Sequence, residues 1–126
     1  MTPRTPPPPT DAELEILQIV WELGEATVRK VHEAISSRRP VAYTTTMTML
    51  GLLVKKGHLR REEEGRAFVY RPAHPKSRVV ARMLDDFLVR VFRGSARPLV
   101  LALVRDRKLS RRDLEEIARI AGEEEP

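Results

Sequence analysis

Three observations predict a mainly α-helical protein with one small β-hairpin. Apolar residues recur at helical spacing along most of the chain. The pattern changes to strand-like alternation between positions 59 and 71, on both sides of a glycine. The chain has 126 residues, of which 41% are hydrophobic and 33% charged, and no cysteine. This length and composition predict one folded domain, or one small domain plus an appendage, without disulfides.

The first two helices are indicated by their caps. Residues 1–9 are rich in proline, which lacks a backbone donor, so we expect a flexible or polyproline tail there. Thr10 or Asp11 can cap a helix that ends near Gly24. Thr27 can cap a second, shorter helix, which the serines at 36 and 37 bring to an end.

A third helix is predicted from about Thr44 to Lys56, with Gly57 as its stop. Thr46, with Met49, Leu50 and Leu53, has the i, i+3, i+4, i+7 spacing of a face turned to the core. Thr44 is a candidate cap, since threonine serves well in that position.

After the third helix the sequence predicts a hairpin. Residues 59–63 and 67–71 alternate, and Gly65 lies at the turn between them. Short helices followed by a basic hairpin are typical of a winged helix-turn-helix, whose recognition helix enters the major groove of DNA. We therefore predict a winged-helix DNA-binding domain over residues 10–75.

The remaining residues, 76–126, are predicted to form a separate helical region. A helix from Ser77 carries an apolar stripe wider than one helix can bury by itself, so some other surface must cover it. Gly94 ends this helix, Pro98 can open another, and Ser110 can cap a last one. The chain closes with an acidic tail.

Positive charge is concentrated in the middle of the chain. The net charge is +5, and the stretch from Arg38 to Arg78 has ten basic residues against three acidic ones. The last seventeen residues have three arginines against six acidic residues. A polyanionic partner is thus expected to contact the middle of the chain rather than its end.

The ingredients of catalysis are missing from the sequence. His32, His58 and His74 fall on different predicted elements without metal-ligand spacing. Asp85 and Asp86 are adjacent, so on a helix they point about 100° apart and cannot form a carboxylate dyad. We predict no enzyme activity, metal or cofactor; a small hydrolase would need a cluster of such groups built by the fold. With no apolar run long enough for a membrane span or secretory signal, we expect a cytoplasmic protein.

The exposed face of the third helix is the candidate site for DNA. Thr45 and Thr48 are β-branched and lie on the outward face, where they lower helix propensity without any gain from burial. Contact with a ligand would offset that cost. Lysines at a helix end also favour its dipole, so their role stays open between dipole and phosphate. Arg29 is equally open between solvent and phosphate. The candidate base or phosphate contacts are Tyr43, Thr44, Thr45, Met47 and Thr48, and the candidate backbone contacts are Lys55, Lys56 and Arg66.

Several motifs together resemble the BlaI/MecI penicillinase-repressor family. They are residues 11–23 (DAELEILQIVWEL), 43–45 (YTT), 53–57 (LVKKG), 64–70 (EGRAFVY), 92–95 (FRGS), 99–101 (LVL) and 108–110 (KLS). The resemblance covers roughly residues 10 to 121. It implies a homodimeric bacterial repressor, with a winged helix and a C-terminal helical dimerisation region, that binds double-stranded DNA at palindromic operators.

The resemblance also implies what covers the wide apolar stripe of the helix from Ser77, because in a homodimer the stripes of two copies can pack against each other. The expected dimer residues are Leu84, Phe87, Leu88, Val91, Leu99, Val100 and Leu103. In the family, a membrane sensor protease system leads to cleavage of the dimerisation region and release from DNA. The matching position here is Ala102–Leu103, where staphylococcal members have an Asn–Phe bond. The family's copper-responsive branch uses cysteine pairs, which this chain lacks.

One alternative of another class stays open on the residues themselves. A winged-helix module could bind an acidic protein through its basic hairpin, without specific binding to DNA. Duplex binding that falls steeply with salt and prefers a palindrome would favour the repressor.

Overall fold

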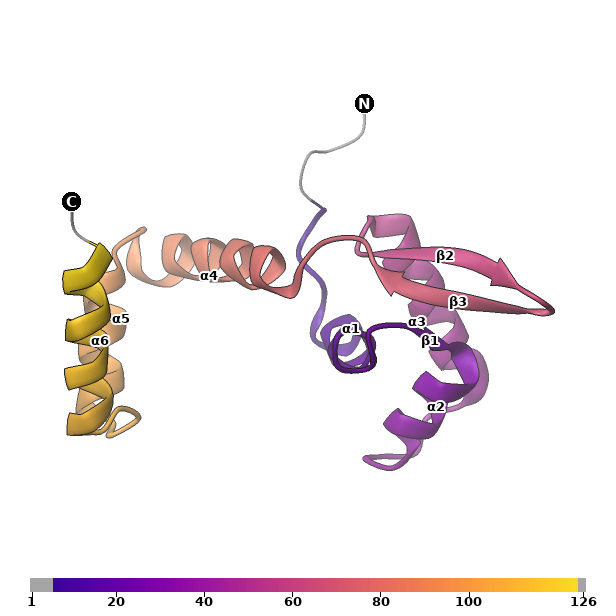
Figure 1. The fold of residues 1–126 in the computed structure, drawn as a ribbon, viewed down its shortest axis with the longest axis horizontal. Coiled ribbons are helices and arrows are strands. Elements are labelled where there is room, and N and C mark those ends of the chain that lie inside the picture. The colour runs from indigo at the N-terminus through magenta and orange to yellow at the C-terminus, as the bar shows by residue number, and fades with distance from the viewer. Residues whose placement is uncertain (1–5, 125–126) are drawn as a thin grey trace. The chain divides into compact units, whose positions relative to one another are not determined.

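The computed structural model describes residues 6–124, which form helices and a small sheet, as the sequence predicts (Figure 1). Two compact units divide the chain, the first ending at Arg82 and the second beginning at Met83. The boundary falls inside a helix, seven residues beyond the predicted one at 75/76. In chain order the elements are α1 (Asp11–Leu23), β1 (Ala26–Thr27), α2 (Val28–Ser36), α3 (Tyr43–Lys56), β2 (Leu59–Glu64), β3 (Ala67–Pro72), α4 (Lys76–Phe92), α5 (Ala96–Arg105) and α6 (Arg111–Glu124).

The predicted caps of α1 and α2 are confirmed. The Glu13 amide donates to Thr10 Oγ1 at 3.2 Å, and the Thr10 amide donates back to Glu13 Oε1 at 2.9 Å, which makes a capping box. Gly24 ends α1 with a φ of 82°, a value that favours glycine. At α2, the Lys30 amide donates to Thr27 Oγ1 at 3.3 Å.

The start of α3 differs from the prediction. The helix begins at Tyr43, and its N-cap is Ala42, whose carbonyl accepts a hydrogen bond from the Thr46 amide. Thr44 is therefore already inside the first turn, and its predicted role as the cap is wrong. The predicted end of α3 is confirmed, because Gly57 follows its last residue in the left-handed conformation, with a φ of 89°.

The sheet contains one strand more than the predicted hairpin. β2 and β3 pair antiparallel with Glu64 opposite Ala67, and Gly65 lies in the turn with a φ of 66°. The short β1 pairs with the other edge of β3, with Ala26 opposite Tyr70, so the strand order is β1-β3-β2. Figure 1 shows the hairpin projecting from the helices of the first unit.

The first unit has one core, which α1, α2, α3 and the base of the sheet build together. Thr46 faces this core, as predicted, and is fully buried with its hydroxyl unpaired among the residues described. Because the opposite side of α3 is open, burial of Thr46 fixes which residues α3 presents to solvent. The main buried apolar side chains are Ile16, Leu17, Ile19, Val20, Val31, Ile35, Leu50, Leu53, Leu59 and Tyr70.

The proline-rich segment is not a free tail over its described part. Pro9 is buried, and the His58 Nε2–H donates to the Pro7 carbonyl at 2.7 Å. Pro9 and the Pro7 carbonyl therefore contact the rest of the first unit, which corrects the expectation of flexibility for this end of the segment. The rest of the predicted tail, residues 1–5, lies outside the described residues.

The second unit has helices but no buried side chain among residues 83–123. α5 begins at Ala96, so Pro98 lies within its first turn, where a missing backbone donor costs nothing. Ser110 caps α6 as predicted: the Asp113 amide donates to Ser110 Oγ at 3.0 Å, and the Ser110 amide donates to Asp113 Oδ2 at 2.9 Å. The backbone hydrogen bond from Ser110 lowers the pKa of Asp113.

The described part of the chain carries neither a membrane-spanning helix nor a metal site. Within residues 6–124, each helix is too short or too polar to cross a bilayer. Across the same residues, histidine and acidic side chains form no group of three that could hold a metal ion.

Candidate nucleic-acid interface

The outer face of α3 carries the predicted contact residues. Tyr43 and Met47 are 46% and 48% exposed, although both are large and apolar in character. Thr44, Thr45 and Thr48 are also exposed, in contrast to the buried Thr46. The helix therefore presents three threonine side chains and two large side chains to solvent, a combination suited to base edges, thymine methyls and phosphates.

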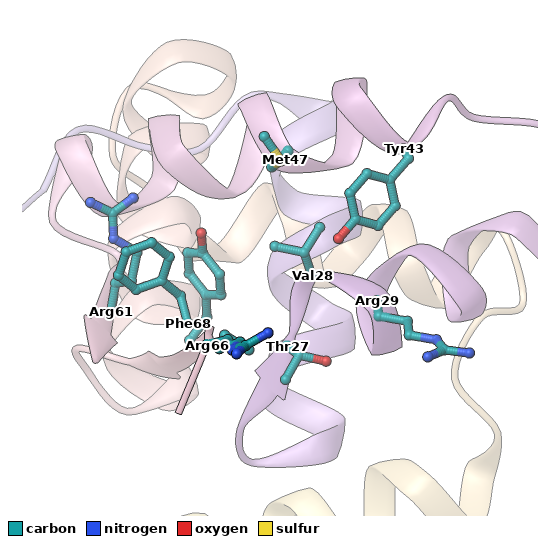
Figure 2. A pocket seen from close by; sticks show the side chains of 10 residues that line it. Thr27, Val28, Arg29, Tyr43, Met47, Arg61, Arg66 and Phe68 are labelled. Atoms are coloured by element: carbon teal, nitrogen blue, oxygen red, sulfur yellow. The ribbon is translucent and has the colours of Figure 1, made fainter. Parts of the chain in front are cut away.

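A groove of about 560 Å³ lies beside this face, between α2, α3 and the hairpin. In Figure 2, Val28, Tyr43 and Met47 lie near one another, and Arg61 lies with Phe68. The groove combines an apolar interior with three arginines, so it can bind an anionic chain that also has apolar parts, as a sugar-phosphate backbone does. Its lining residues are Thr27, Val28, Arg29, Tyr43, Met47, Arg61, Arg66, Ala67, Phe68 and Tyr70.

Tyr43 is held in place at the mouth of this groove. The His32 ring meets the Tyr43 ring edge-on, with 5.3 Å between their centroids. His32 is itself fixed, because its Nε2–H donates to the Val41 carbonyl at 2.9 Å. α2 therefore positions the first side chain of α3 before any ligand binds.

The hairpin contributes two arginines to the groove. Arg66, next to the turn, is exposed and forms no ion pair within residues 6–124. The Arg61 guanidinium lies 4.3 Å from the centre of the Phe68 ring, a cation–π contact that orients it. Sequence reasoning selected Arg66 but missed Arg61 and Phe68. Strand alternation could have placed both on one face, since Arg61 pairs with Tyr70 and Glu63 with Phe68.

The two lysines at the end of α3 have different environments. Lys55 is exposed, whereas Lys56 Nζ lies 2.5 Å from Glu13 Oε1. Glu13 is only 3% exposed. Its burial is the largest single influence and raises its pKa, but hydrogen bonds from Lys56 and Thr10 together outweigh burial, so the pKa of Glu13 is lowered. Lys56 thus ties α3 to α1 and is not a free cation for phosphate.

Other basic residues of the central segment are also paired within the chain. Arg39 contacts Glu15 at 2.5 Å and Arg38 contacts Glu22 at 4.0 Å. Arg71 contacts three glutamates. Pairing reduces the positive charge available to a partner below what the sequence count indicates. The basic residues of this segment that form no ion pair with any described residue are Lys55, Arg60, Arg61, Arg66, Lys76 and Arg78.

The apolar residues expected to bind a second copy lie on α4 and α5. Four are exposed, namely Leu84, Phe87, Val91 and Val100, and three are half-buried, namely Leu88, Leu99 and Leu103. Ala102 and Leu103, at the position that matches the family's cleaved bond, lie inside α5. Other exposed apolar residues, outside that expected set, are Val80, Val89, Leu101, Val104, Ile117 and Ile120.

Comparison with known proteins places this chain among bacterial repressors. The family model described as penicillinase repressor matches residues 9–123. The penicillinase repressor of Bacillus licheniformis is 32% identical over 114 residues, which cover 90% of this chain and 89% of that one. The transcriptional regulator BlaI of Mycobacterium tuberculosis is 38% identical over 92 residues, covering 72% of this chain and 67% of that one.

A solved structure of a DNA complex shows a similar fold. It is the solution structure of the Bacillus licheniformis BlaI monomeric form with the blaP half-operator. The similarity covers 58% of this chain and 89% of that one, with 36% sequence identity and a TM-score of 0.51.

Proposed function

Because the chain belongs to the penicillinase repressor family, a family of DNA-binding transcriptional repressors rather than enzymes, we propose that it represses transcription as a homodimer on a palindromic operator. The observation that carries this proposal is the exposed face of α3 beside an arginine-containing groove. In this chain that surface is open to solvent, and the fold around it is similar to that of a protein solved with half-operator DNA.

Base contacts in this proposal belong to α3. Tyr43, Thr44, Thr45, Met47 and Thr48 lie on its exposed side, and a single α-helix fits the major groove. Their hydroxyls can donate to or accept from base edges, and their methyl groups can contact thymine. These residues then set the operator sequence that the protein prefers.

Phosphate contacts belong to the rim of the groove and the end of α3. Arg66, Arg61 and Lys55 are exposed there. Such contacts fix the position of the protein on the duplex and make affinity depend on salt. Lys56 is left out of this set because Glu13 holds it.

Dimerisation is supported by the second unit, in which residues 83–123 have no buried side chain. Phe87 is 38% exposed and Val91 54% exposed, although apolar burial is what stabilises helices of this length. A second copy can cover these side chains through a self-complementary contact. An interface that buries about 1,000 Å² or more would be large enough for a stable dimer.

Release from DNA is proposed to follow cleavage at Ala102–Leu103, through the membrane sensor protease system that the family resemblance implies. The bond lies inside α5, so a protease that needs an extended chain must first unwind that helix. Cleavage would separate Leu103 and all of α6 from the rest of the dimerisation region, and this weakens the dimer.

Selection of binding sites from random duplexes with the purified chain tests the proposed function. The expected result is a palindrome whose two halves are separated by about one or more helical turns, centre to centre. A recovered site that lacks two-fold symmetry would contradict a homodimer. Failure to enrich any sequence would contradict the proposed function itself and favour a protein-interaction module.

A further inference from the structure

The hairpin that carries Arg61 and Arg66 also carries an acidic run. Glu62, Glu63 and Glu64 follow one another on β2, and all three are exposed. In the proposed function this hairpin lies against DNA, where uncompensated carboxylates would repel phosphates. The position and neutralisation of these carboxylates therefore matter for binding.

Strand alternation divides the charged residues of the hairpin between two faces. On β2, Arg60, Glu62 and Glu64 share one face, and Arg61 and Glu63 share the other. On β3, Arg71 shares the face of Glu62 and Glu64, because it lies two and four residues from their partners Val69 and Ala67. The acidic residues at 62 and 64 thus lie on the face opposite Arg61 and its partner Phe68.

Arg71 gathers the carboxylates on that face. Its Nη1 lies 3.1 Å from Glu62 Oε2, and its Nη2 lies 3.2 Å from Glu64 Oε2. The same Nη2 donates to Glu25 Oε2 at 2.7 Å, in the segment between α1 and β1. One guanidinium therefore joins both strands of the hairpin to the body of the winged-helix unit.

The surroundings favour this arrangement over an ordinary surface ion pair. The Arg71 side chain is 30% exposed, so its pairs are less screened than exposed ones. Partial burial opposes the charge of Arg71, but the three carboxylates outweigh burial and raise its pKa. By contrast, Arg60 lies opposite Arg71 in the register and forms no ion pair with any residue of the described range.

We propose that Arg71 is a positioning residue for DNA binding: by holding Glu25, Glu62 and Glu64, it fixes the hairpin and offsets part of the negative charge on its acidic face, so that Arg61 and Arg66 can reach the phosphate backbone. This inference rests on the proposed function. Arg71 needs no contact with DNA for this role, since it acts through the carboxylates it holds.

The test compares Arg71→Met with Arg60→Met, a matched control that removes a cation from the same hairpin. Each is also combined with Glu62→Gln and Glu64→Gln, and the selected operator is titrated with every variant at low and high salt. We expect Arg71→Met to weaken binding roughly tenfold at low salt and less at high salt. Adding the two Gln changes to Arg71→Met should recover the part of that loss that comes from repulsion between the carboxylates and phosphate, and leave the part that comes from the unanchored hairpin. Adding them to the natural chain or to Arg60→Met should change affinity little.

Two results would overturn the proposal. The first is an Arg71→Met variant that the Gln changes do not rescue, because Arg71 would then bind DNA itself or serve only the fold. The second is equal behaviour of the Arg71→Met and Arg60→Met series. Arg71→Lys is expected to recover only part of the binding, since one ammonium cannot replace a guanidinium fork that reaches three carboxylates.

Amide exchange without DNA separates this proposal from the proposed function. Residues 59–72 should lose protection in Arg71→Met and keep it in Arg60→Met. If this difference appears but no duplex binds to the natural chain, Arg71 fixes the hairpin as proposed and the proposed repressor function is wrong. If the difference is absent, Arg71 does not fix the hairpin, and the proposal is wrong whatever the chain binds.

Discussion

Replacing Lys56 with methionine tests whether the end of α3 is held by a structural ion pair. The change leaves Glu13, which is 3% exposed, without its cation, while the Thr10 amide still donates to it. Losing one partner of a fully buried pair costs about 3–5 kcal/mol, and losing an exposed pair costs about 0–1 kcal/mol. The Lys56 side chain is 29% exposed, so we expect an intermediate loss of about 2 kcal/mol at neutral pH.

The loss should depend on pH with a definite sign. In the folded protein the pKa of Glu13 is lowered from its ordinary value of 4.5. Its contribution to stability is therefore present above 4.5 and is lost as the pH falls through the lowered folded value. In the variant, burial without a cation raises the pKa of Glu13, so protonation removes the penalty in acid. The difference in stability between the two proteins should shrink toward zero as the pH falls below the lowered pKa that Glu13 has in the natural chain.

Urea denaturation of both proteins at several pH values measures this difference. Lys55→Met is the matched control, and its stability should stay within about 0.5 kcal/mol of the natural chain because Lys55 is exposed. In operator titrations the control should show the larger effect. Lys55→Met should lower the dependence of operator affinity on salt by a slope of about 1, and Lys56→Met should leave that slope unchanged. A stability loss that is the same at every pH, or none at all, would refute the reasoning about Glu13.

The remaining predictions concern DNA and the dimer. Arg66→Ala should weaken binding on all duplexes alike and lower the salt slope by about 1, and an unchanged slope in electrophoretic titrations would remove Arg66 from the phosphate contacts. Thr48→Val should instead change the binding free energy for the preferred base at one operator position, relative to the other bases, by about 1–3 kcal/mol, and an unaltered selected site would argue against base contact. Phe87→Asp should halve the mass seen in sedimentation and abolish tight operator binding, so a persistent dimer would be contrary to the proposal. A chain ending at Ala102 should likewise sediment as a monomer and bind the operator more weakly; full affinity would speak against release by cleavage there.

The helices and the hairpin were predictable because their signals are local. Thr10 and Thr27 cap their helices within three residues, and Gly57 ends α3 through its own φ. β1 was missed because two residues cannot show a period, and it exists only because the free edge of β3 pairs with it. Ala42 displaced Thr44 as the cap without a side-chain hydrogen bond, so no sequence preference could have found it.

The candidate site was predictable in part. The outward threonines of α3 followed from helical spacing around Thr46, which the core fixes. The pair between Lys56 and Glu13 and the pair between Arg71 and Glu25 could not be predicted, because these partners lie 43 and 46 residues away in the sequence. A count of basic residues gives the sign of the partner, but only the fold determines which cations remain free to meet it.

Sedimentation of the chain with a labelled palindrome and with one isolated half-site tests the central claim most directly. The account predicts two chains on each palindrome, with binding that is much tighter than to the half-site and falls steeply as salt rises. One chain on each palindrome, or the same affinity for the palindrome and a scrambled duplex, would contradict it.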